Sequence, residues 1–220
     1  MASDRRLSAD VLAQLATLGA TTDAEAMDAY RAAMRVAYWD DKDVPSTLAI
    51  ADAGVSRFRD AAGDGDESFA LELRSAAKGL LYDVASFTWV GWDEPDVVIT
   101  SAEAAVGLDA ARSNLAMAID LDKGDLPLAR AHWMLGAHLL TSGGHVEAGR
   151  AFEASRASAV AAGADVEAEL AVAFGALNGV AAGNSGGEAA LAASLERLGA
   201  MDNGEAFVAQ ATTARAVLGC

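Results

Sequence analysis

The chain has 220 residues, of which 53% are hydrophobic, and 32 acidic against 16 basic residues give a net charge of −16. Because phosphate contacts need a basic surface, this balance argues against a general nucleic-acid-binding protein. The single cysteine, Cys220, excludes an internal disulfide, and no apolar run has the length of a membrane span. We therefore expect a cytoplasmic protein whose partners include neither nucleic acid nor a membrane.

Helices account for nearly all of the predicted structure, because apolar residues recur at helical spacing and only three prolines interrupt the chain. A short helix comes first, capped by Ser8 and stopped by Gly19. The other nine helices are expected at about 23–39, 46–62, 66–89, 99–119, 125–141, 145–162, 166–182, 187–198 and 203–218. Short connections between them favour an antiparallel order.

An aspartate follows a glycine at three of the expected helix starts. These junctions are Gly65–Asp66, Gly124–Asp125 and Gly163–Asp165. Aspartate oxygens accept hydrogen bonds from the free N–H groups of a first helical turn, so we expect each aspartate to act as an N-cap. Asn203 is expected to cap the last helix in the same way.

One spacing recurs, in which a small residue is followed by an apolar residue four positions later and by a second small residue three positions after that; three copies match it and a fourth, at Ala51, matches it more loosely. The copies begin at Ala51, Ala104, Ala148 and Gly187, so the steps between them are 53, 44 and 39 residues. Self-similarity at such periods is typical of repeat proteins, in which no unit can bury its apolar face alone. The sequence therefore predicts stacked helical hairpins.

The third copy carries a longer pattern. Leu135–Gly136 and Leu139 lie in one expected helix, the Gly143–Gly144 turn follows, and Ala148 and Phe152 lie in the next helix. This arrangement resembles the tetratricopeptide motif, a helix–turn–helix of about 34 residues. The resemblance is good over residues 125–200 and loose before them, where the first helices are longer.

The resemblance implies a right-handed α–α superhelix of about ten antiparallel helices. We expect it to form one domain over residues 1–220, with repeat hairpins at about 23–62, 66–120, 125–163 and 165–199 and a terminal helix at 203–218. In tetratricopeptide proteins the first helices line a concave groove that binds peptides or protein segments.

The resemblance also indicates which residues face that groove. In it Trp133, Leu80 and Val172 would provide apolar contact, whereas Arg130, Asp83 and Glu169 would set polarity and register. The expected groove residues in chain order are Leu80, Asp83, Arg130, Trp133, Ala137, Thr141, Glu169, Val172 and Ala176. The Lys and Asn residues with which some family members grip a terminal carboxylate are absent from these positions.

Two tryptophans stand before matching acidic segments. Trp39 precedes Asp40–Asp43, and Trp92 precedes a similar segment that ends at Asp96. A tryptophan beside acids could stack on a partner's Arg or Lys, which would make Trp39 and Trp92 secondary partner contacts. Alternatively, each tryptophan fills a gap between repeats and the acids cap the following helix.

No pattern of catalytic or ligand-binding residues emerges from the sequence. His132 and His138 are six residues apart, whereas zinc-binding pairs on a helix need three or four, and calcium-loop beginnings at 64–66 and 120–122 do not continue. We expect no metal and no cofactor. The predicted function is non-enzymatic binding of a basic or apolar protein or peptide. A peptide- or small-ligand-sensing module, a self-associating structural protein or homodimer, and an enzyme with an unrecognised site are the alternatives.

Overall fold

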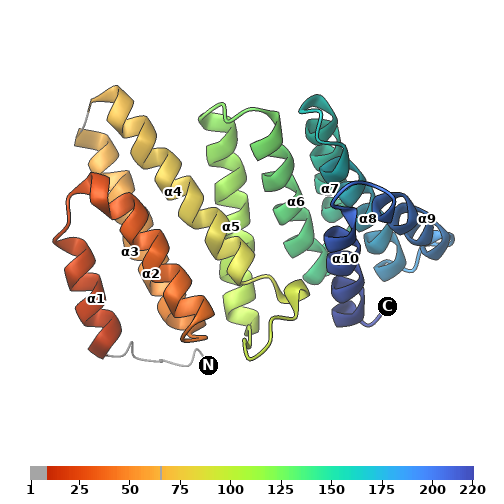
Figure 1. The fold of residues 1–220 in the computed structure, drawn as a ribbon, viewed down its shortest axis with the longest axis horizontal. Helices are drawn as coiled ribbons and strands as arrows, with labels where there is room; N and C mark the ends of the chain where they lie inside the picture. Colours follow the sequence, from red (N-terminus) through yellow and green to blue (C-terminus); the bar gives the residue numbers. More distant parts are fainter. Residues whose placement is uncertain (1–8, 65) are drawn as a thin grey trace. The chain divides into compact units, whose positions relative to one another are not determined.

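The computed structural model of the chain describes residues 9–64 and 66–220, and within them the protein is all-α. Ten α-helices and one 3₁₀-helix follow one another there without a strand (Figure 1). They are α1 (Ala9–Gly19), α2 (Asp23–Trp39), α3 (Val44–Asp64), α4 (Glu67–Phe87), η1 (Val90–Trp92), α5 (Ser101–Asp120), α6 (Asp125–Thr141), α7 (His145–Ala161), α8 (Asp165–Ala181), α9 (Gly187–Gly199) and α10 (Gly204–Leu218). The predicted helices are confirmed to within a few residues, and only η1 lies where a loop was expected.

The chain forms two compact units. Unit 1 runs to Thr88 and also includes Asp96–Met117, whereas unit 2 consists of Trp89–Pro95 and Ala118–Cys220. In unit 1, α2 packs on α3 and α3 on α4; in unit 2, α6, α7, α8 and α9 pack consecutively (Figure 1). Consecutive packing of this kind is typical of α-helical solenoids. The division into hairpins and the single domain stay predictions.

The core of unit 1 depends on a close approach of α3 to its neighbours. Gly54 of α3 lies against Tyr30 of α2 and Leu80 of α4, whose side-chain atoms would stand 2.8 and 2.6 Å from an added Cβ. Tyr30 also meets the ring of Phe58 edge to face at a centroid distance of 5.8 Å. A glycine is therefore needed at position 54 because these two large side chains occupy the space beside it.

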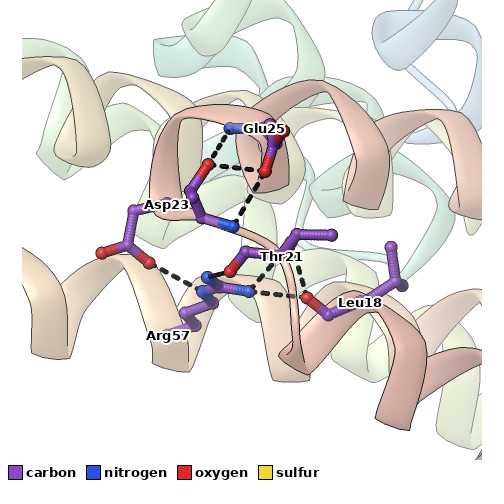
Figure 2. A network of polar contacts seen from close by, with 6 residues as sticks. Leu18, Thr21, Asp23, Glu25 and Arg57 are labelled. Carbon is purple, nitrogen blue, oxygen red and sulfur yellow. Dashed lines mark hydrogen bonds and ion pairs between the residues drawn. The ribbon is translucent and has the colours of Figure 1, made fainter.

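Arg57 of α3 holds the connection between α1 and α2 (Figure 2). Its guanidinium donates to the carbonyl oxygen of Leu18 at 2.7 Å and to the carbonyl oxygen of Thr21, and its Nε pairs with the Asp23 carboxylate at 2.8 Å. Beside this network Glu25 completes a capping box with Thr22, the N-cap of α2. One side chain thus binds a carbonyl in the last turn of α1, a carbonyl in the connection and an acid in the first turn of α2.

Close helix packing in unit 2 depends on small residues. The Phe152 ring of α7 covers Gly136 of α6, where an added Cβ would lie 2.7 Å from the ring. Ala129, Ala159 and Ala168 form a buried cluster contributed by α6, α7 and α8. At these positions no large side chain separates the helices, so they can approach one another closely.

The predicted caps are correct at some helix starts and wrong at others. Asp66 does cap α4, because its Oδ1 accepts from the Phe69 N–H at 3.1 Å. Asp125 and Asp165 are instead the first residues of α6 and α8 and make no capping hydrogen bond. There the negative charge of each carboxylate interacts favourably with the helix dipole. Asn203 precedes α10 but is left-handed, with φ of 64°, and makes no side-chain cap. Ser8 and Gly65 lie outside the described residues.

The recurring spacing marks one face of each second helix. Its residues in α3, α7 and α9 are all buried, whereas in α5 only Ala111 is fully buried and Ala104 and Leu108 are half-exposed. In α9, Gly187 lies so close to α8 that an added Cβ would stand 2.9 Å from the backbone nitrogen of Val180. In α3, α7 and α9 the repeat therefore identifies positions at which the helix packs, and in α5 it does so only at Ala111.

Candidate functional site

The charged residues expected in the concave groove are already paired within the protein. In unit 1 the Asp83 carboxylate accepts from Arg31 at 2.6 and 3.0 Å, and this hydrogen bond raises the pKa of Arg31. In unit 2, Arg130 pairs with Glu167 at 2.9 Å. The third expected residue, Glu169 of α8, accepts from Arg197 of α9 at 2.8 Å. Partly exposed pairs such as these contribute about 0–1 kcal/mol each, so they fix side-chain orientation more than stability.

The apolar residues expected in that groove lie mainly in the core. Leu80, Trp133 and Ala137 expose only 1%, 6% and 0% of their surface, whereas Thr141, Val172 and Ala176 are half-buried. A buried side chain cannot touch a partner in this conformation, so the expectation that Trp133 and Leu80 offer accessible anchors needs correction. The physical reason is that a first helix of an antiparallel stack turns its largest apolar side chains towards its neighbours.

An aromatic cluster in unit 2 explains the burial of Trp133. Its ring lies 5.5 Å from the Trp89 centroid, 4.9 Å from Phe174 and 6.1 Å from Trp92. The Trp89 indole donates to the Ala137 carbonyl at 3.0 Å, whereas the buried Trp133 indole nitrogen has no hydrogen-bond partner among the residues that the structure describes. Sequence reasoning placed Trp89 at the end of a helix and did not foresee this cluster.

The two tryptophans with matching acidic segments have different surroundings. Trp39 of α2 remains 45% exposed, with the Lys42 ammonium 5.5 Å from its ring centroid. Trp92, in contrast, is half-buried and meets Trp89 edge to face. Asp43 caps α3 by accepting from the Ser46 N–H at 3.1 Å. For the segment after Trp39, this agrees with the alternative in which the acids cap the following helix. The corresponding Asp96 is not a cap; α5 is capped by Thr100, which bonds reciprocally with Glu103.

An open groove in unit 1 lies between α3 and α5. The backbone of α5 stands farther from α4 than that of α3 does, although the Asn114 amide donates to the Lys78 carbonyl at 2.8 Å and ties α5 to α4. The resulting groove, here the α3–α5 groove, encloses about 220 Å³. Its apolar surface includes the half-buried Leu48 of α3 and Leu81 of α4, above the buried Val55 and Val84. Sequence reasoning did not identify this groove.

Two helix faces of regular spacing form the walls of this groove. The α3 wall consists of Leu48, Ala51, Asp52, Val55 and Arg59, and the α5 wall consists of Val106, Asp109, Ala110 and Ser113. Leu81 and Val84 of α4 lie between these walls. Residues three, four and seven apart share one side of a helix, so this spacing was the signal available in the sequence.

Charged side chains at the edge of the α3–α5 groove are free to meet a partner. Within the described residues, neither Asp52 nor Arg59 takes part in an ion pair, and both are exposed. Asp109 pairs only with Arg112 on its own helix, at 3.2 Å and with 77% of its side chain exposed. Val106 is 46% exposed. The groove therefore combines accessible apolar surface with unpaired charges of both signs.

The three histidines have different surroundings. Burial lowers the pKa of His132 below its usual range, and His138 is buried within α6. His145 Nδ1 lies 3.0 Å from the Asn178 side-chain oxygen.

Over residues 9–64 and 66–220, no group of three or more His, Cys, Asp or Glu side chains is arranged to hold a metal ion. None of the helices in this part of the chain is long and apolar enough to cross a membrane.

Comparisons with known proteins give no further assignment. Neither a scan against protein-family models nor searches of curated proteins and of solved structures find a match. The assignment that stands is the coarser one, an all-helical protein built by repeated helix packing.

Proposed function

We propose that this chain is a tetratricopeptide-like module that binds a peptide segment of a partner protein and catalyses no reaction. The family resemblance is supported by the fit of Gly136 against Phe152, the two positions at which the motif has a small and an aromatic residue. Consecutive helix packing within each unit supports it as well.

The observation that carries the proposal is the α3–α5 groove. It offers apolar side chains that are half-buried at Leu48 and Leu81 and exposed at Val106. Beside them, the exposed Asp52 and Arg59 form no ion pair among the described residues. Apolar grooves between helices with a polar rim are a recurring mode of peptide recognition. The surface of the first helices, predicted from the resemblance, is less well suited, because its charged residues are paired and its large apolar side chains are buried.

The test uses a displayed library of random peptides selected on the full chain. Peptides recovered on the wild type are measured against Val106→Gln by fluorescence anisotropy. Val106 is half-exposed, so the neutral substitution removes apolar contact in the groove without disturbing the core. We expect binding to weaken about tenfold, which corresponds to about 1.4 kcal/mol.

Val160→Gln is the matched control. Val160 is also an exposed helical valine, at 56% against 46% for Val106, but it lies on α7 of unit 2 and does not line the groove. We expect it to bind like the wild type. Selected peptides that bind all three proteins equally would refute the proposed groove function. Trp133→Ala is a poorer test because it would disturb the aromatic core of unit 2.

A further inference from the structure

We propose that the α3–α5 groove binds an amphipathic helical segment with a fixed charge order. The segment carries a Lys or Arg that pairs with Asp52 and, two helical turns along, an Asp or Glu that pairs with Arg59. Apolar side chains between these charges enter the groove. This inference rests on the proposed function and specifies the partner's chemistry.

The volume of the groove favours side chains over a larger ligand. Drug-sized ligands and cofactors occupy pockets of about 300–1,000 Å³, whereas a cavity of about 150 Å³ accepts a benzene molecule. At about 220 Å³ the α3–α5 groove has room for one or two apolar side chains. A peptide that presents such side chains from outside fits this volume better than a cofactor does.

The shape of the groove favours a helical segment. Its α3 wall extends from Leu48 to Arg59, twelve residues that rise about 16 Å along the helix axis. The α5 wall from Val106 to Ser113 covers a further two turns. A groove bounded by two helices accepts the ridge of side chains that a third helix presents at positions three, four and seven apart.

The charges fix the order of the partner's side chains. Asp52 and Arg59 are seven residues apart on α3, so they lie on one side of the helix about 10 Å from each other. Because neither has an ion-pair partner among the described residues, each can pair with an incoming charge without breaking an existing contact. Opposite charges two turns apart on a bound helix complement both.

The charge of the whole chain favours a different protein over a second copy. Each copy carries a net charge of −16, so two copies repel each other at long range. The groove edge contributes two carboxylates, Asp52 and Asp109, against the single guanidinium of Arg59. A partner segment with excess positive charge near Asp52 is therefore attracted, and an acidic copy of this chain is not.

The test uses the same peptide library with charge-reversed proteins. In Asp52→Arg/Arg59→Glu the two groove charges are exchanged and the net charge is unchanged. We expect peptides selected on the wild type to share a basic and an acidic residue six to eight positions apart with apolar residues between them. They should bind the reversed protein at least tenfold more weakly, and peptides with the two charges exchanged should recover binding to it.

Asp28→Arg/Arg35→Glu is the matched control, because these exposed α2 residues are also seven apart but do not line the groove. It should bind like the wild type, and circular dichroism should show all variants folded. Peptides that need Val106 but ignore the Asp52/Arg59 exchange would overturn this inference and leave the proposed function standing. Peptides that ignore Val106 would overturn both. Association of the wild type with itself, blocked by Val106→Gln in sedimentation, would identify a second copy as the occupant and overturn the inference.

Discussion

At the scale of single residues, the fold depends on glycines placed opposite large rings. Gly136 and Phe152 belong to different helices, and the sequence already related them through the tetratricopeptide-like spacing. The structure supplies the reason, since the ring occupies the space that a Cβ at position 136 would need. The sequence could not show which glycines are packed in this way, because Gly79 is also helical and nothing lies within 4 Å of its would-be Cβ.

We expect Gly136→Ala to destabilise the protein and Gly79→Ala to stabilise it. Overpacking against a buried ring costs about 1–3 kcal/mol, which outweighs the gain of about 1 kcal/mol in helix propensity. At position 79 only the gain in propensity applies. Urea unfolding midpoints of both variants provide the measurement, and Gly136→Ala at or above the wild-type midpoint would contradict the packing argument.

At the scale of elements, α1 is attached to unit 1 largely through Arg57. Few apolar residues of α1 are buried, Leu18 being the fully buried one, whereas Arg57 binds carbonyl oxygens at its end and in the following turn (Figure 2). Hydrogen bonds to a charged donor contribute about 1.5–3 kcal/mol each when partly buried. The attachment of α1 therefore combines the buried Leu18 with polar contacts at its C-terminal end.

Replacing Arg57 with Ala should release α1 without unfolding α6–α9. We expect amide hydrogen exchange in α1 to accelerate at least tenfold, because the substitution removes the guanidinium that joins Leu18, Thr21 and Asp23 to α3. Arg57→Lys should act similarly, since one ammonium cannot reproduce the forked geometry of the guanidinium. Arg35→Ala, an exposed arginine of α2, should leave α1 exchange unchanged. An equal acceleration throughout the chain after Arg57→Ala would mean that α1 has no separate stability.

The elements were more predictable than the site. Helix ends follow from local signals such as the capping box at Thr22 or the left-handed Gly163. Such signals involve residues close together in the chain, so they can be recognised in the sequence. The α3–α5 groove depends on how far α5 stands from α4, a distance that no local signal determines. The burial of Trp133 depends in the same way on Trp89, which lies 44 residues earlier in the chain.

At the scale of the whole molecule, the excess of acidic residues dominates. The net charge of −16 makes the exposed carboxylates repel one another, and exposed ion pairs such as Arg156–Glu153 offset little of this repulsion. Salt screens both the repulsion among the carboxylates and the attraction within the ion pairs. Because more charges take part in the repulsion, screening it has the larger effect on stability. The acidic composition could be read from the sequence, whereas which acids are paired could not.

Raising sodium chloride from about 20 mM to about 500 mM should therefore increase the melting temperature, because the screening length falls below about 5 Å. A gain of about 1 kcal/mol corresponds to about 2–4 °C for a chain of this size. Thermal unfolding followed by circular dichroism measures it. A melting temperature that falls with salt would show that the ion pairs outweigh the repulsion.

The distribution of tryptophans gives the two units separate optical signals. Unit 2 holds Trp89, Trp92 and Trp133 with ring centroids 4.8–6.1 Å apart, close enough for their excited states to couple and to produce a strong near-ultraviolet dichroism. Unit 1 has only Trp39, whose exposed ring emits at longer wavelength than buried indoles. Red-edge excitation of fluorescence therefore reports on unit 1 and near-ultraviolet dichroism on unit 2, so the unfolding of each can be followed in the native chain without any attached dye.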